Sequence, residues 1–212
     1  MSLTLESRIQ RLNEMMSEGR IIRNDWVSSD AQGREVACLL TALSPEAGED
    51  ENPDACPAEV MPAWLAHITP WLDDSGSYTE WPRVIRRYAA CAARWSVLDD
   101  AAWRRVEIVA RRVAVVEAMR HTSDAMALDA CRRVLAWLDA DMPEEVCVTI
   151  EKEIVGVAYL AVSAASRVAG ATTAAWSAAW AAVEMGAVCA KREAADRITD
   201  EILSALETEC GL

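Results

Sequence analysis

The 212-residue sequence has no phenylalanine, only two lysines, and few of the residues that interrupt helices, with eight glycines and seven prolines. Runs of alternating β-branched residues, which are typical of strands, are also scarce. Alanine is abundant instead: the chain has 39 alanines, together with 19 arginines and nine tryptophans. Alanine and arginine are strong helix formers. The composition therefore predicts an all-α protein, a single compact bundle of about seven to nine helices, and argues against a sandwich, a barrel or a doubly wound sheet.

Motifs of the common enzyme classes are missing from the sequence. GxGxxG, GxxxxGK[ST], GxSxG and HExxH do not occur, and no Cys-x2-Cys pair indicates a metal site. The two histidines, His67 and His121, lack the glutamate three residues earlier that di-iron bundles use. We therefore expect a non-enzymatic protein with no metal and no cofactor. One alternative stays open, an enzyme with an unrecognised cysteine–histidine centre.

The seven cysteines are odd in number and widely spaced, so they predict no disulfide framework. The first residues lack the basic and apolar regions of a secretion signal, and we expect a cytoplasmic protein with reduced cysteines. The most apolar stretch, 154–190, has only Arg167 and Glu184 as charges. Because Arg167 and Gly170 divide it into uncharged runs shorter than the roughly 20 residues of a span, we expect no contact with the membrane.

Hydrophobic spacing predicts where the helices lie, because apolar residues recur three and four positions apart on one helix face. The predicted helices cover 4–18, 36–43, 61–72, 79–98, 99–121, 124–138, 143–169 and 172–189, with a last one through 198–206. No repeat of regular period is present. We therefore expect one helical domain over 1–212, with the acidic segment 44–59 as a candidate soft boundary.

The segment 44–59 has six acids, no base, three prolines and one glycine. This composition predicts an exposed loop with a strong negative field. Its candidate partner-binding residues, which we call the acidic surface, are Glu46, Glu49, Asp50, Glu51 and Asp54.

Positive charge gathers in the middle of the chain. Residues 83–133 contain 11 basic and 6 acidic side chains, whereas the remaining residues contain 10 basic and 28 acidic ones. Two interpretations are open: acids of the same fold neutralise the arginines, or a basic ridge and acidic flanks each recognise a partner of opposite charge. The candidate basic ridge consists of Arg83, Arg86, Arg87, Arg104, Arg105, Arg111 and Arg112. The net charge of −13 opposes direct binding to nucleic acid and favours a protein partner, for example a basic nucleic-acid-binding protein.

Three segments carry a resemblance to known proteins: 33–45 (GREVACLLTALSP), 61–67 (MPAWLAH) and 174–182 (AAWSAAWAA). They resemble a group of uncharacterised alanine- and tryptophan-rich helical proteins of bacteriophages and prophages. The resemblance implies no catalytic residues; it implies an accessory protein that binds and inhibits a host nucleic-acid-handling or defence complex, such as a CRISPR complex. The alanine- and tryptophan-rich C-terminal part, which contains 174–182, is also similar to immunity-like proteins of bacteria, which leaves neutralisation of a toxin as an alternative. Self-association into a homo-oligomer through Trp176 and Trp180 is also open.

Overall fold

The computed structural model describes residues 3–121, 125–140 and 188–212. Within these residues the chain forms eight α-helices, two 3-10 turns and one two-stranded sheet, which confirms the predicted all-α class. The helix predicted over 143–169 and nearly all of that over 172–189 lie outside the described residues. Contacts between residues group the chain into two compact units. The first consists of Met1–Glu107 together with Ala195–Leu212, and the second of Ile108–Ala194.

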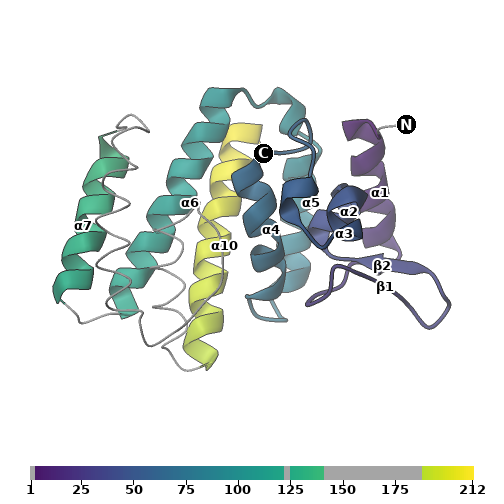
Figure 1. Ribbon diagram of the computed structural model, residues 1–212, viewed down its shortest axis with the longest axis horizontal. Coiled ribbons are helices and arrows are strands. Elements are labelled where there is room, and N and C mark those ends of the chain that lie inside the picture. The colour runs from purple at the N-terminus through teal and green to yellow at the C-terminus, as the bar shows by residue number, and fades with distance from the viewer. Residues whose placement is uncertain (1–2, 122–124, 141–187) are drawn as a thin grey trace. The chain divides into compact units, whose positions relative to one another are not determined.

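The first unit contains most of the elements (Figure 1). They are α1 (Leu5–Ser17), β1 (Val27–Ser29), β2 (Glu35–Ala37), α2 (Leu39–Leu43), α3 (Pro45–Glu49), η1 (Pro53–Ala55), α4 (Ala63–Asp74), α5 (Trp81–Ala92), η2 (Trp95–Val97), the start of α6 (Asp100–His121) and the end of α10 (Val188–Cys210).

Helix α1 begins where the sequence predicts, after Thr4. The Ser7 backbone N–H donates a hydrogen bond to Thr4 Oγ1 at 3.2 Å, as expected of a helix N-cap. The buried side chains of α1 are Arg8, Leu12 and Met15. Because hydrophobic spacing counts only apolar residues, it could not predict that a charged side chain, Arg8, is buried on this helix.

The helix predicted over 36–43 is wrong at its start. Residues 35–37 form strand β2, antiparallel to β1, with Val27 opposite Ala37. Helix α2 begins only at Leu39, with Cys38 as its N-cap. A tight turn joins the strands: the N–H of Gly33 (φ +74°) donates to the Asp30 carbonyl at 2.9 Å. All three residues of β1 are exposed, so no buried alternation marks it in the sequence.

The segment 44–59 contains two short helices, α3 and η1, where the sequence predicts a loop. Pro45 and Pro53 stand in the first turn of these helices, where a missing N–H leaves no helical hydrogen bond unmade. The side chain of Asn52 accepts a hydrogen bond from the Asp54 N–H at 3.0 Å and caps η1. The segment lies within the first unit. Whether it marks a soft boundary in one 1–212 domain stays a prediction.

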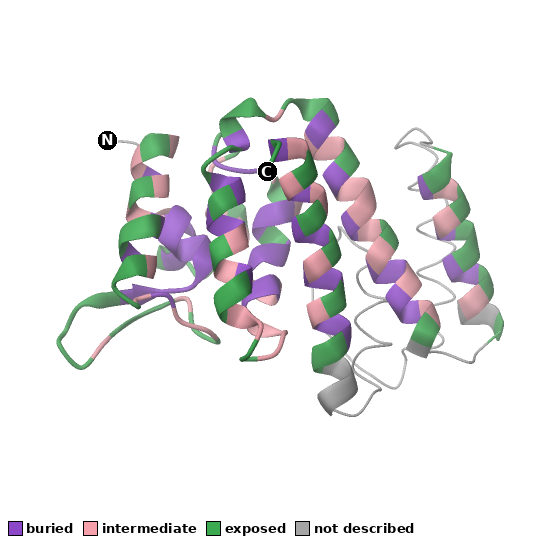
Figure 2. Cartoon of the chain, turned by 180° about the vertical axis from the view of Figure 1, so that it is seen from behind, coloured by how far each residue is buried: buried purple, intermediate pink, exposed green. Residues whose placement is uncertain are grey.

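Tyr88 of α5 is the largest aromatic side chain that is fully buried in the first unit. Its hydroxyl lies 2.9 Å from Thr69 Oγ1 of α4, and its ring packs edge-to-face on Trp95 at 5.5 Å. Along each long helix, buried residues recur between exposed ones, so that one face of the helix carries a stripe of buried side chains (Figure 2). In α10 this stripe includes Ile198, Ile202 and Leu206.

The second unit is described for 108–121, 125–140 and 188–194. It contains the end of α6, helix α7 (Ala125–Asp139) and the start of α10. Its core is made of small and branched side chains of α6 and α7: Ala114, Val115, Ala118, Ala130, Cys131, Val134 and Leu138. Small side chains on both helices allow their backbones to approach closely.

Candidate partner-binding surfaces

Arg87, in the middle of the basic ridge, binds acids of α10. Its guanidinium donates to both carboxylate oxygens of Glu207 at 2.6 and 2.7 Å and to Asp200 at 2.6 Å. Only 16% of the Arg87 side chain is exposed. The guanidinium lowers the pKa of Glu207, and its contacts together with those of Arg83 lower the pKa of Asp200. Arg87 therefore joins α5 to α10.

Four further ridge arginines pair with acids of their own unit. Arg83 contacts Glu80 at 2.7 Å and Asp200 at 3.0 Å. The remaining pairs are Arg104–Glu107, Arg105–Glu209 and, in the second unit, Arg112–Asp139. Arg86 is exposed and has no ion pair among the described residues, and Arg111 is half-buried. The pairs fit the interpretation that acids of the fold neutralise these arginines; partner binding by the ridge stays a prediction.

Within the acidic surface, Glu46 has a structural contact. Its carboxylate accepts hydrogen bonds from Arg8 Nη1 and Nη2 at 2.8 and 2.6 Å, and from the Ser44 hydroxyl at 3.1 Å. The Arg8 side chain is 0% exposed, and its guanidinium also donates to the Leu43 carbonyl. The hydrogen bonds from Arg8 lower the pKa of Glu46 to about 2. Glu46 thus holds a buried cation in place.

The other four acids of the acidic surface are exposed. Glu49, Asp50 and Glu51 form no ion pair with any described residue, and Glu51 has a positive φ of 50°. Asp54 Oδ1 lies 2.7 Å from Nε2 of His67, which projects from α4. The structure therefore keeps Glu49, Asp50 and Glu51 together as outward-facing carboxylates and assigns Glu46 and Asp54 to internal contacts.

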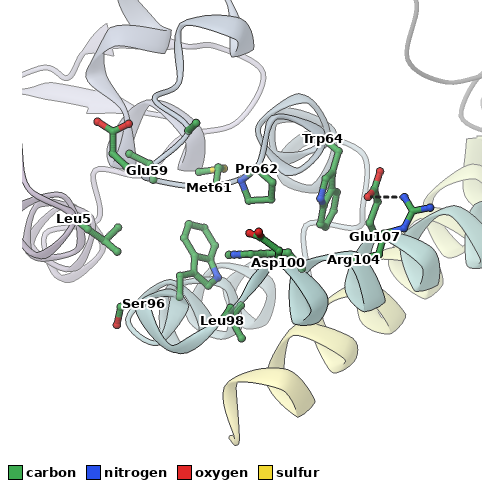
Figure 3. Close-up of a pocket in the computed structure, with 14 residues that line it drawn as sticks. Leu5, Glu59, Met61, Pro62, Trp64, Ser96, Leu98, Asp100, Arg104 and Glu107 are labelled. Atoms are coloured by element: carbon green, nitrogen blue, oxygen red, sulfur yellow. Dashed lines mark hydrogen bonds and ion pairs between the residues drawn. The ribbon is translucent and has the colours of Figure 1, made fainter. Parts of the chain in front are cut away.

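A hollow of about 500 Å³ opens in the first unit next to the acidic segment (Figure 3). It is surrounded by Leu5 of α1, the chain from Ala58 to Pro62, Trp64 of α4, the first turns of α6, and Trp95, Ser96 and Leu98. Glu59 belongs both to the acidic segment and to the wall of the hollow. Hydrophobic spacing gives no sign of this hollow, because its tryptophans lie on helix faces whose apolar residues are typical of an ordinary core.

Three tryptophans line the hollow at steep angles to one another. The ring centroids of Trp64 and Trp103 are 6.5 Å apart with an interplanar angle of 71°, and those of Trp95 and Trp103 are 5.7 Å apart at 66°. Trp95 is 3% exposed, whereas Trp64 and Trp103 are half-buried. The rings are therefore inclined walls of one recess and do not form a flat stack.

The described residues contain no group of three or more histidine, cysteine or acidic side chains that could hold a metal ion. Burial raises the pKa of each of the five cysteines whose side chains are described, Cys38, Cys56, Cys91, Cys131 and Cys210. A catalytic thiolate needs the opposite shift. Cys147 and the side chains of His121 and Cys189 lie outside the described part of the chain.

In the described ranges we find no helix with both the length and the apolar character that crossing a membrane requires. The apolar stretch 154–190 falls almost wholly outside those ranges. No protein-family model, curated protein or solved structure matches this chain.

Proposed function

We propose that this chain is a non-enzymatic acidic module that binds a basic protein partner. The observation that carries the proposal is the separation of its charges: arginines of α5 and α6 pair with acids of α10, while Glu49, Asp50 and Glu51 face outward without an ion pair among the described residues. Clustered, uncompensated carboxylates attract a positively charged surface and speed its association.

The resemblance to phage and prophage proteins suggests that the partner is a host nucleic-acid-handling or defence complex, which the chain would inhibit. The alternative, an immunity-like protein that neutralises a toxin, uses the same acidic surface against a different partner. An enzyme with a cysteine–histidine centre has less support, because the pKa of every described cysteine is raised. The identity of the captured partner distinguishes the first two.

A pull-down with three tagged forms of the full chain, read by mass spectrometry, tests the proposal. The forms are wild type, the variant E49Q/D50N/E51Q and a control, E6Q/E193Q/E201Q, which removes the same number of charges at exposed positions elsewhere. Glu46 is kept in all three because it holds Arg8. We expect wild type and the control to retain a basic partner at low salt and to release it at about 0.5 M salt, where charges are screened beyond a few ångströms.

The variant E49Q/D50N/E51Q should recover much less of that partner. Equal recovery by the variant and wild type would remove these three acids from the interface. Recovery of no basic protein by any form would contradict the proposal as a whole.

A further inference from the structure

The hollow in the first unit has an excess of negative charge. Three carboxylates line it, Glu59, Asp100 and Glu107, with one guanidinium, that of Arg104. Arg104 Nη1 lies 3.3 Å from the Glu107 carboxylate, and the two side chains point toward one another (Figure 3). Glu59 and Asp100 are exposed and form no ion pair with any described residue. Glu59 also interacts electrostatically with Arg8, whose guanidinium is already hydrogen-bonded to Glu46. Two carboxylates at this recess thus have no ion pair of their own and can attract a cation.

The aromatic walls of the hollow favour the same kind of ligand. The face of an indole ring carries negative electrostatic potential, and a cation within about 6 Å of the ring centroid is attracted to it. Trp64, Trp95 and Trp103 line one recess at interplanar angles of 66° and 71°. Trp64 and Trp103 are half-buried and can be reached by a ligand, whereas Trp95 is only 3% exposed. Elsewhere the first unit makes such a contact internally, because the Arg23 guanidinium lies 4.5 Å from the centroid of the Tyr78 ring.

We propose that this hollow receives one cationic side chain, arginine or lysine, of the basic protein partner. The inference rests on the proposed function and names the residue type that the partner inserts. The alkyl stem of such a side chain would contact Leu5, Leu98 and the tryptophans, while its charged head would face Glu59 and Asp100. Glu59 is also the last acid of the segment 44–59, so one partner can engage the hollow and the outward carboxylates together.

Titration of the 15N-labelled full chain with three tripeptides tests the inference. The probes are acetyl-Gly-Arg-Gly-amide, acetyl-Gly-Lys-Gly-amide and the uncharged norleucine analogue, each added to about 10 mM because contacts of a single side chain are weak. The readout is the indole N–H signals in a 1H–15N spectrum. We expect saturable shifts of two or three of the nine tryptophan indoles with the arginine or lysine peptide, and no shifts with norleucine.

Two variants matched in charge locate the site. E59Q/D100N should weaken binding of the cationic peptide about fivefold or more, whereas E49Q/D50N should change it less than twofold. Both substitute exposed residues, and Asp99 still accepts the Ala102 N–H at 2.8 Å to cap α6, so each variant keeps the fold.

Three results would overturn the inference. The first is the absence of a saturable shift with either cationic peptide, and the second is equal binding by wild type and E59Q/D100N. The third is a response to tetramethylammonium without a response to the peptides, which would assign the hollow to a free quaternary ammonium ion. Failure of the proposed function gives a different pattern, in which E49Q/D50N/E51Q loses no partner in the pull-down while the peptides still bind.

Discussion

Replacing Glu46 with glutamine tests the ion pair that joins α1 to the acidic segment. The substitution keeps the size of the side chain and removes its charge, which leaves the guanidinium of Arg8 with neutral acceptors at a fully buried position. An uncompensated buried charge is strongly destabilising, by about 3–5 kcal/mol where both partners are fully buried.

The expected loss of stability in E46Q is smaller than this, because Glu46 is only partly buried. A pKa lowered from its ordinary value of 4.5 to about 2 corresponds to about 3.4 kcal/mol at 1.36 kcal/mol per pH unit. Because 39% of the Glu46 side chain is exposed, water screens part of this energy, and we expect E46Q to lower the free energy of unfolding by about 2 kcal/mol at pH 7. The urea midpoint, followed by far-UV circular dichroism, should fall by about 1 M.

The pH dependence gives an independent check. Because the pKa of Glu46 is lower in the folded chain, its contribution is complete above about pH 4.5 and is lost as the pH falls through about 2. The gap between wild type and E46Q should therefore narrow between pH 5 and pH 2.5. The control E49Q, at an exposed position, should change stability by less than about 0.5 kcal/mol. An E46Q variant as stable as E49Q, or a gap that is constant with pH, would refute the structural role of Glu46.

Three further substitutions test contacts of the first unit by urea unfolding. R87M should lower the free energy of unfolding by about 2 kcal/mol, because it breaks several charge-assisted hydrogen bonds. R105M should lower it by less than about 1 kcal/mol, because the Arg105 side chain is 58% exposed. Equal losses would show that burial does not set the strength of these ion pairs. Burial raises the pKa of Asp73 to about 7, so the free energy of unfolding of wild type should fall by about 2.5 kcal/mol between pH 5 and pH 8 as this group ionises. D73N should lack this fall. Parallel pH profiles of the two proteins would argue against an ionising buried Asp73. G48A should cost about 1–3 kcal/mol, because a Cβ there would lie 2.3 Å from Thr41 Cγ2 in a buried contact, and a variant of wild-type stability would show that Thr41 moves freely.

The sequence predicts the all-α class and most helices of the described residues, because those helices have a clear apolar stripe. The prediction fails where polar groups decide the structure. The hairpin 27–37 depends on the turn at Asp30 and Gly33, whose hydrogen bonds leave no trace in hydrophobic spacing. Likewise, α3 and η1 are short helices within a polar segment, where the prolines read as loop signals although they occupy first turns.

The candidate sites follow the same division. Composition identifies the acidic segment and the arginine-rich middle, but it assigns one role to all residues of a cluster. The structure separates them: Glu46 holds a buried arginine, Asp54 contacts His67, and Glu49 is exposed without an ion pair among the described residues. The hollow escapes prediction because Trp64, Trp95 and Trp103 come from three elements, and only tertiary packing brings them together.

The excess acids of the sequence therefore fall into two groups, those that pair with arginines of the fold and those that face outward. In α10, acids such as Asp200 and Glu207 bind arginines of α5, so their charges stabilise the fold and are partly neutralised. Glu49 and Glu59 are exposed and form no ion pair with a described residue, so their charges can attract a cationic partner. Removal of outward acids should therefore weaken partner binding without loss of stability, whereas removal of α10 acids should do the reverse. A partner that depended on Glu207 rather than on Glu49 and Glu59 would place the interface on the acids of α10 instead of the acidic surface.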